Sequence, residues 1–126
     1  MNLSLARQHY SMTKESKIES SSQNAFAIKL AMEQLINSLN TLLTDEQLEK
    51  REEAFEVALT RIYILQKCLD FDAGGELSRN LFKTYEHVRT TTIAHMSGKA
   101  PKVELEKAIE YIKIILEGWN ELLTNE

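Results

Sequence analysis

Apolar residues recur at spacings of three and four along four stretches of the chain, which predicts four amphipathic helices. The stretches cover residues 25–43, 48–69, 77–96 and 105–123. The fourth has the most regular seam, made of Leu105, Ala108, Ile112, Ile115, Trp119 and Leu122. Seams of this kind are buried against other helices, so the four stretches together predict an α-helical core.

Short segments separate the stretches and contain residues that begin or end helices. In "TDEQ", residues 44–47, the hydroxyl of Thr44 is expected to accept the backbone N–H of the last residue, as in a capping box. Asp72 is expected to cap the third helix, and Gly98 to close it in the left-handed conformation. Pro101 suits the first turn of the fourth helix.

The lengths of the elements predict how they are arranged. Helices of about 20 to 25 residues are roughly 30 to 37 Å long, and short connections make consecutive helices antiparallel. The sequence therefore predicts an all-α fold, an antiparallel up-down-up-down four-helix bundle, over residues 25–124. Residues 1–24 are rich in Ser, Gln, Asn and Lys, and their apolar residues have no steady period. This segment is expected to form a flexible N-terminal arm.

Composition excludes several classes of function. The chain has 126 residues, the size of one domain, and a net charge of -4 without a cluster of Lys and Arg. Nucleic acid is therefore not expected as a partner. No segment has the roughly 18 consecutive apolar residues of a membrane-spanning helix, so no membrane insertion is expected. The single cysteine, Cys68, permits no intrachain disulfide, which favours the cytoplasm.

The stretch "LDFDAGGELSRNL", residues 69–81, has the beginning of a calcium loop. An EF-hand needs oxygen ligands at positions 1, 3 and 5, glycine at position 6 and a bidentate glutamate at position 12. Asp70, Asp72 and Gly75 match, but position 5 is a glycine and position 12 a leucine. Too few hard ligands remain, so we expect no metal here and interpret the stretch as a boundary between helices.

Catalytic constellations are equally missing from the sequence. A di-iron bundle needs Glu-x-x-His pairs, and none of His9, His87 and His95 has a glutamate three residues before it. Cys68 has no basic neighbour in sequence to lower its pKa, and no nucleophile or phosphate-binding motif occurs. We therefore expect no enzymatic activity and no cofactor.

Some apolar residues lie outside the predicted seams. Successive residues of a helix are 100° apart, which places five of them away from the main stripes. These residues are Phe26 and Leu30 in the first helix, Val57 and Ile64 in the second, and Ile114 in the fourth. They are imperfections of the seams, or positions that the N-terminal arm covers, or a groove for an amphipathic helix of another protein.

"LDFDAGGELSRNLFKTYEHV" is followed some 30 residues later by "LEGWNELL". These two segments resemble sequences of the flagellin export chaperone family, FliS. The matching positions are Leu69, Asp70, Gly74, Gly75, Glu76, Asn80, Leu81, Tyr85 and Trp119. The resemblance is strong over residues 48–123 and weak before them. Tyr10 resembles the aromatic residue of the family's N-terminal arm.

The resemblance implies a cytoplasmic chaperone of bacterial flagellum biogenesis. Such a protein binds the disordered C-terminal segment of flagellin, prevents its premature polymerisation and presents it to the gate of the type III export apparatus. In the family the client wraps around the bundle and folds into helices in its apolar grooves, and the arm can occupy part of that surface. We expect the partner-binding residues to be Tyr10, Phe26, Leu30, Val57, Ile64 and Ile114.

The chain also departs from the family's usual pattern. The family usually has an Ala-Ser-Pro turn before its first helix, whereas residues 19–39 read "ESSSQNAFAIKLAMEQLINSL". A divergent member of the family would explain this difference. A helical bundle that binds another amphipathic client would explain it equally well. A bundle that buries its second stripes in a homodimer is a separate alternative, so the expected state is a monomer or a weak homodimer.

Overall fold

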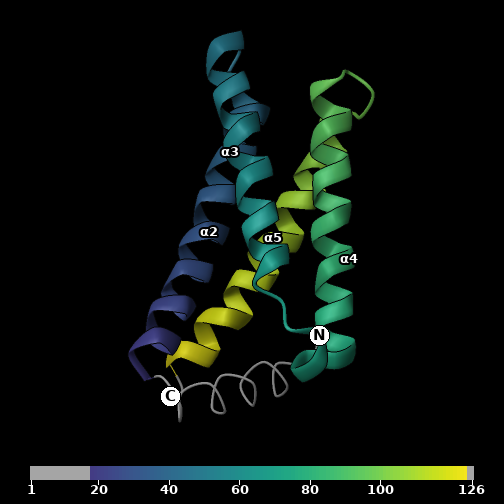
Figure 1. Cartoon of the computed structure of the whole chain (residues 1–126). Helices are drawn as coiled ribbons and strands as arrows, with labels where there is room; N and C mark the ends of the chain where they lie inside the picture. The colour runs from purple at the N-terminus through teal and green to yellow at the C-terminus, as the bar shows by residue number, and fades with distance from the viewer. Residues whose placement is uncertain (1–17, 125–126) are drawn as a thin grey trace.

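The computed structural model describes residues 18–124, and its regular elements over this range are all α-helices. The helices are α2 (Ile18–Thr44), α3 (Leu48–Lys67), α4 (Phe71–Met96) and α5 (Lys102–Thr124). They run alternately up and down and form one bundle (Figure 1). The predicted all-α antiparallel bundle is therefore confirmed.

Each helix of the bundle packs against two others. Helix α2 contacts α3 and α5, and α4 contacts the same two helices from the opposite side. Figure 1 shows α5 crossing the bundle obliquely, from beside α4 at its start toward the start of α2 at its end. The indole Nε1 of Trp119 donates a hydrogen bond to the carbonyl of Ala25 at 3.2 Å, which holds the end of α5 against α2.

The core is made of the apolar stripes that the sequence predicts. Its largest fully buried side chains are Met32, Leu35, Leu39, Leu42, Ile62, Leu65, Val88, Thr92, Leu105 and Ile112. Burying an aliphatic side chain of this size contributes about 1.5–3 kcal/mol relative to leaving it exposed. The buried hydroxyl of Thr92 donates to the carbonyl of Val88 at 2.7 Å, so this polar group is satisfied within the core.

The first helix starts earlier than its apolar pattern suggests. Helix α2 begins at Ile18, inside the segment that the sequence assigns to the arm, and continues to Thr44. Polar residues without a period are compatible with a helix when its later turns are packed. The division between arm and bundle at residues 24 and 25 stays a prediction, and Tyr10 lies outside the described residues.

The capping box predicted at residues 44–47 is wrong. Because α2 continues through Thr44, the hydroxyl of this residue bonds back to the carbonyl of Asn40 at 2.9 Å. The N-cap of α3 is Gln47, which makes no side-chain cap hydrogen bond. Asp45 replaces the predicted cap in part, since its carboxylate accepts the backbone N–H of Gln47 at 2.9 Å.

The predicted end of the third helix is confirmed. Gly98 has a φ of 77°, and its N–H donates to the carbonyl of His95 at 3.0 Å. The next N–H, that of Lys99, donates to the carbonyl of Ala94 at 2.7 Å. This pair of hydrogen bonds is the Schellman motif, in which a glycine satisfies the last carbonyls of a helix.

Candidate partner-binding surfaces

The sequence "LDFDAGGELS" forms the corner between α3 and α4, and the cap of α4 is Asp70 rather than the predicted Asp72. One carboxylate oxygen of Asp70 accepts the N–H groups of Asp72 and Ala73, each at 3.0 Å. The backbone carbonyl of Asp70 accepts the hydroxyl of Ser78 at 2.9 Å. The carboxylate of Asp70 is therefore hydrogen-bonded to the backbone of the first turn of α4. Among the described residues no group of three His, Cys, Asp or Glu side chains is placed to hold a metal ion.

Two glycines shape this corner for different reasons. A Cβ at Gly74 would lie 1.9 Å from the hydroxyl oxygen of Ser78, so a side chain there would displace the hydroxyl from its hydrogen bond. Gly75 has φ 53° and ψ -125°, a conformation that residues with a Cβ rarely adopt. The kink at Gly75 turns the first turn of α4 away from the rest of the helix.

Three aromatic side chains of α3 and α4 are exposed, and we call them the aromatic face: Tyr63, Phe71 and Phe82. Phe71 lies in the segment before the kink at Gly75. The rings of Phe71 and Phe82 meet edge to face with centroids 5.9 Å apart, and both residues are exposed. Tyr63 is 58% exposed, and the ammonium of Lys67 lies 5.5 Å from its ring centroid. The periodicity of the sequence did not identify these three residues, because each lies at the margin of the apolar stripe that its helix buries in the core.

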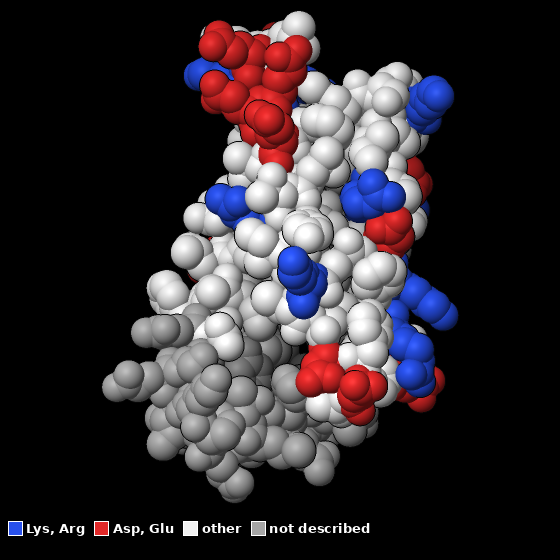
Figure 2. Space-filling model, viewed as in Figure 1, with Lys and Arg blue, Asp and Glu red and all other residues white. Residues whose placement is uncertain are grey.

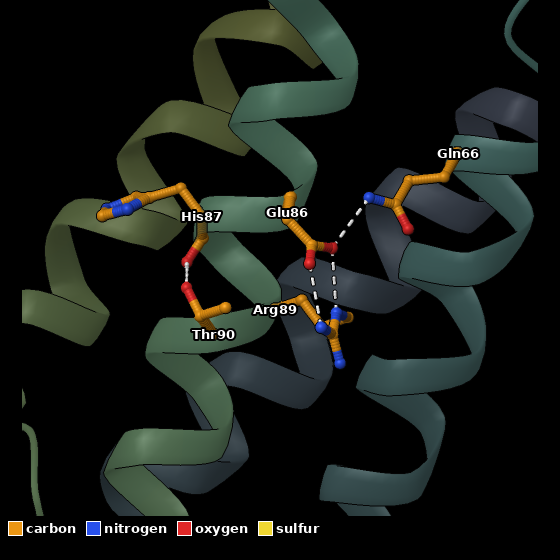
Figure 3. A network of polar contacts seen from close by, with 5 residues as sticks. All are labelled: Gln66, Glu86, His87, Arg89 and Thr90. Atoms are coloured by element: carbon orange, nitrogen blue, oxygen red, sulfur yellow. Dashed lines mark hydrogen bonds and ion pairs between the residues drawn. The ribbon is translucent and has the colours of Figure 1, made fainter.

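A polar network joins α3 to α4 (Figure 3). The carboxylate of Glu86 accepts two hydrogen bonds from the guanidinium of Arg89, at 2.8 and 2.9 Å, and one from the amide of Gln66 at 3.2 Å. These hydrogen bonds, together with the charge of Arg89, lower the pKa of Glu86 to about 2. The bond from Gln66 to Glu86 sets which residues of the two antiparallel helices lie level.

The lowered pKa of Glu86 predicts a pH-dependent contribution to stability. The ordinary pKa of this carboxyl is near 4.5, so its stabilising effect is fully present above that pH and is lost as the pH falls toward 2. Glu86→Gln should therefore lower the thermal midpoint at pH 7, and the difference from the wild type should shrink between pH 4.5 and 2. Glu53→Gln, at an exposed glutamate with no ion pair among residues 18–124, is the control. A difference that stays constant across this pH range would contradict the assignment.

Four predicted contact residues lie along α2 and α3, and we call them the outer stripe: Phe26, Leu30, Val57 and Ile64. Phe26 is 63% exposed, Leu30 and Ile64 are exposed, and Val57 is half-buried. The guanidinium Nε of Arg61 donates to the side-chain oxygen of Gln34 at 2.6 Å. Because α2 and α3 are antiparallel, this contact places Leu30, one turn before Gln34, level with Ile64, nearly one turn after Arg61.

The fifth predicted contact residue, Ile114, lies between α4 and α5, which is the opposite side of the bundle from the outer stripe. It lines a hollow of about 270 Å³, which we call the α4–α5 hollow. The lining residues are Leu77, Asn80, Leu81, Thr84, Tyr111, Ile114 and Ile115. The oblique course of α5 explains the hollow, because the later turns of α5 lean toward α2 and away from the first turns of α4 (Figure 1).

The hollow combines residues of two kinds. Leu77 and Ile115 are buried and form its floor, while Ile114 and Tyr111 are 58% and 41% exposed. The ring of His87 lies 5.9 Å from that of Tyr111 and marks where α4 and α5 come together. Leu77 begins the third apolar stretch of the sequence, and its burial agrees with that pattern. The pattern missed Tyr111, because the distance between two helices is not encoded in the periodicity of either.

The described residues show no group activated for catalysis. Cys68 is exposed, and partial burial of its thiol raises the thiol pKa, which leaves less of the nucleophilic thiolate at neutral pH. Burial also raises the pKa of the Tyr85 hydroxyl.

Charge is unevenly distributed over the surface. On the face shown in Figure 2, acidic side chains gather at the upper end, where α3 begins, and much of the surface below them is uncharged. The first half of α3 contains Glu49, Glu52, Glu53 and Glu56. Within residues 18–124, no helix is both long enough and apolar enough to cross a bilayer.

The bundle exposes apolar side chains on opposite sides, at the outer stripe and at the α4–α5 hollow. The profile of the family described as flagellar protein FliS matches residues 6–126, so the chain belongs to the FliS family. FliS is a family of flagellar export chaperones and not of enzymes, as the resemblance in α4 and α5 predicts. Comparisons with curated proteins and with solved structures find no match.

Proposed function

We propose that this protein is a cytoplasmic chaperone that binds the disordered C-terminal segment of flagellin, prevents its premature polymerisation and delivers it to the type III export apparatus. The observation that carries the proposal is the pair of apolar surfaces on opposite sides of the bundle. A segment that folds into helices on binding can occupy both, since amphipathic helices place apolar residues into grooves of this kind.

The energetics of such a complex favour tight but reversible binding. Burial contributes about 25 cal/mol per Å² of apolar surface, whereas ordering a disordered client costs about 2–5 kcal/mol or more of the gross interaction energy. Only the difference appears as affinity. Because the interaction involves no covalent step, the chaperone releases its client when the export apparatus binds the client more tightly.

Isothermal titration of the purified protein with a peptide from the C-terminus of a flagellin tests this proposal. We expect saturable binding with a negative heat-capacity change, because apolar surface leaves water on both partners. A peptide of the same composition in scrambled order is the control. Equal binding of the two peptides, or binding of neither, would contradict the proposed function.

A further inference from the structure

The exposed side of α3 changes from acidic to basic along its length. Five exposed residues share one line of the helix at spacings of three, four and seven: Glu49, Glu52, Glu56, Tyr63 and Lys67. The line begins with carboxylates, which belong to the acidic cluster in Figure 2, and it ends with an aromatic ring and an ammonium. None of these charged groups has an ion pair within residues 18–124.

Helix α4 adds two cations to the basic end of this surface. Arg79, Phe82 and Glu86 follow one another at spacings of three and four, and Glu86 accepts the amide of Gln66 from α3 at 3.2 Å. Arg79 and Phe82 therefore lie on the side of α4 that faces α3, and Lys83 is one turn after Arg79. Both cations are exposed, and neither has an ion pair in the described part of the chain.

The carboxylates near this end leave the three cations available. Asp70 accepts backbone N–H groups at the cap of α4, and Glu86 is bonded to Arg89. Asp72 and Glu76 lie in the first turns of α4, nearer the end of the bundle than Lys83. The part of the surface that carries the aromatic face is therefore basic.

Apolar side chains lie between the two charged ends. Leu48, Phe55 and Leu59 are on the side of α3 that faces α4, because they share the line of Gln66 at spacings of seven, four and seven. Leu48 is 65% exposed, and the other two are half-buried. The aromatic face continues this apolar strip to the other end of the bundle. We call the whole surface, with its acidic end, its basic end and the strip, the α3–α4 face.

We propose that the α3–α4 face binds the same face of a second copy of this chain, with the two α3 helices antiparallel. A twofold axis beside residues 59–60 makes the contact isologous, since each copy then contributes the same residues. The axis places Lys67 level with Glu52 of the second copy, and Phe71 level with Leu48 of the second copy. Each end of the contact therefore joins opposite charges and two exposed apolar side chains.

Charge identifies a second copy as the partner of this face. The chain has a net charge of -4, so two copies repel each other when they approach at random. A parallel pairing would also bring the carboxylates of the two α3 helices together. The antiparallel pairing alone brings each acidic end to a basic end, and complementarity of this kind selects one orientation.

The size of the face indicates a weak dimer. Helix α3 has 20 residues, so it is about 30 Å long, and two neighbouring helices are about 20 Å wide. The contact thus covers roughly 600 Å² per copy, which is at the lower limit of specific interfaces. The outer stripe and the α4–α5 hollow lie on either side of the face and are not part of it, so the inference does not depend on the client.

Sedimentation equilibrium of the wild type tests the dimer. We expect the average mass to rise from one chain toward two between about 1 and 100 µM protein. Raising the salt concentration from about 0.05 to 0.5 M should increase the Kd of the dimer at least about threefold, because salt screens exposed charges. A monomer at all these concentrations, or a Kd that does not respond to salt, would overturn the proposal.

Reversal of the charges at one end tests the orientation. Lys67→Glu/Lys83→Glu makes both ends of the face acidic, and Glu52→Lys/Glu56→Lys makes both ends basic. All four positions are exposed. Each double variant alone should dimerise at least about tenfold more weakly than the wild type, whereas an equimolar mixture of the two should form a heterodimer.

A charge reversal on α5 is the control for net charge. Lys102→Glu/Lys113→Glu changes the net charge as much as the first double variant does, at exposed positions outside the face, and should alter the Kd by less than about twofold. Circular dichroism shows that each variant is folded. Folded variants that form no heterodimer would contradict the antiparallel contact. Double variants that dimerise as tightly as the wild type would show that the copies meet through another surface, such as the outer stripe.

Discussion

Replacing Ile64 by Asp should weaken binding of the flagellin C-terminal peptide by about 30-fold, roughly the 2 kcal/mol of an interface hot spot. Ile64 is 36% exposed and belongs to the outer stripe, so the free chaperone loses little packing. The carboxylate would have to be buried without a partner when the client binds, and this penalty falls on the complex alone. Titration calorimetry measures the effect.

The free chaperone should tolerate the same substitution. We expect Ile64→Asp to lower the free energy of unfolding by about 1 kcal/mol or less, because it changes helix propensity and a partly exposed contact. Asn40→Asp is the matched control, since this exposed residue of α2 lies outside the outer stripe. If Ile64→Asp lost helix content in proportion to affinity, Ile64 would be a core residue and the outer stripe would be misplaced.

Two isoleucines of α5 should differ in how much their replacement by alanine lowers the stability of the protein. Ile112 is 0% exposed, and Ile112→Ala should destabilise the protein by about 2–5 kcal/mol because it leaves a cavity in the core. A change of this size lowers the thermal midpoint by roughly 10 °C in a domain of this length. Ile114 is 58% exposed, and Ile114→Ala should change stability by no more than about 0.5 kcal/mol.

For client binding we expect the opposite order, with a larger effect from the substitution at Ile114 than from the one at Ile112. Ile114→Ala removes apolar surface from the α4–α5 hollow, so it should raise the Kd for the peptide about tenfold while the thermal midpoint stays near that of the wild type. Chemical denaturation and calorimetry on both variants check the pair. An unchanged affinity for Ile114→Ala would show that the client does not enter the hollow.

The periodicity of the sequence was sufficient to predict the four helices and most of the core. It also identified residues with no place in the core, because the direction of a side chain around a helix follows from its position in the chain. Phe26, Leu30, Ile64 and Ile114 are exposed for this reason. The helix ends were predicted less well. Thr44 and Asp72 were both chosen as caps, although the residues that act there are Asp45, in part, and Asp70.

The periodicity of each helix could not predict the α4–α5 hollow or the aromatic face, because both depend on how the helices pack against one another. Whether a half-exposed residue such as Leu81 lies in a hollow depends on how far α5 leans from α4, and that is set by contacts such as the bond from Trp119 to Ala25. Phe71 becomes part of a surface because the kink at Gly75 brings it against Phe82. Spacing along the sequence indicated a bend at these glycines, but not its direction.

The central claim is that the exposed apolar surfaces of this bundle bind a client that folds as it binds. Far-ultraviolet circular dichroism of the protein, of a flagellin C-terminal peptide and of their mixture tests this claim directly. The account predicts that the mixture has more helix than the sum of its two components, and that the excess disappears with Ile64→Asp. A mixture whose spectrum equals that sum, at concentrations where calorimetry shows saturation, would contradict the account.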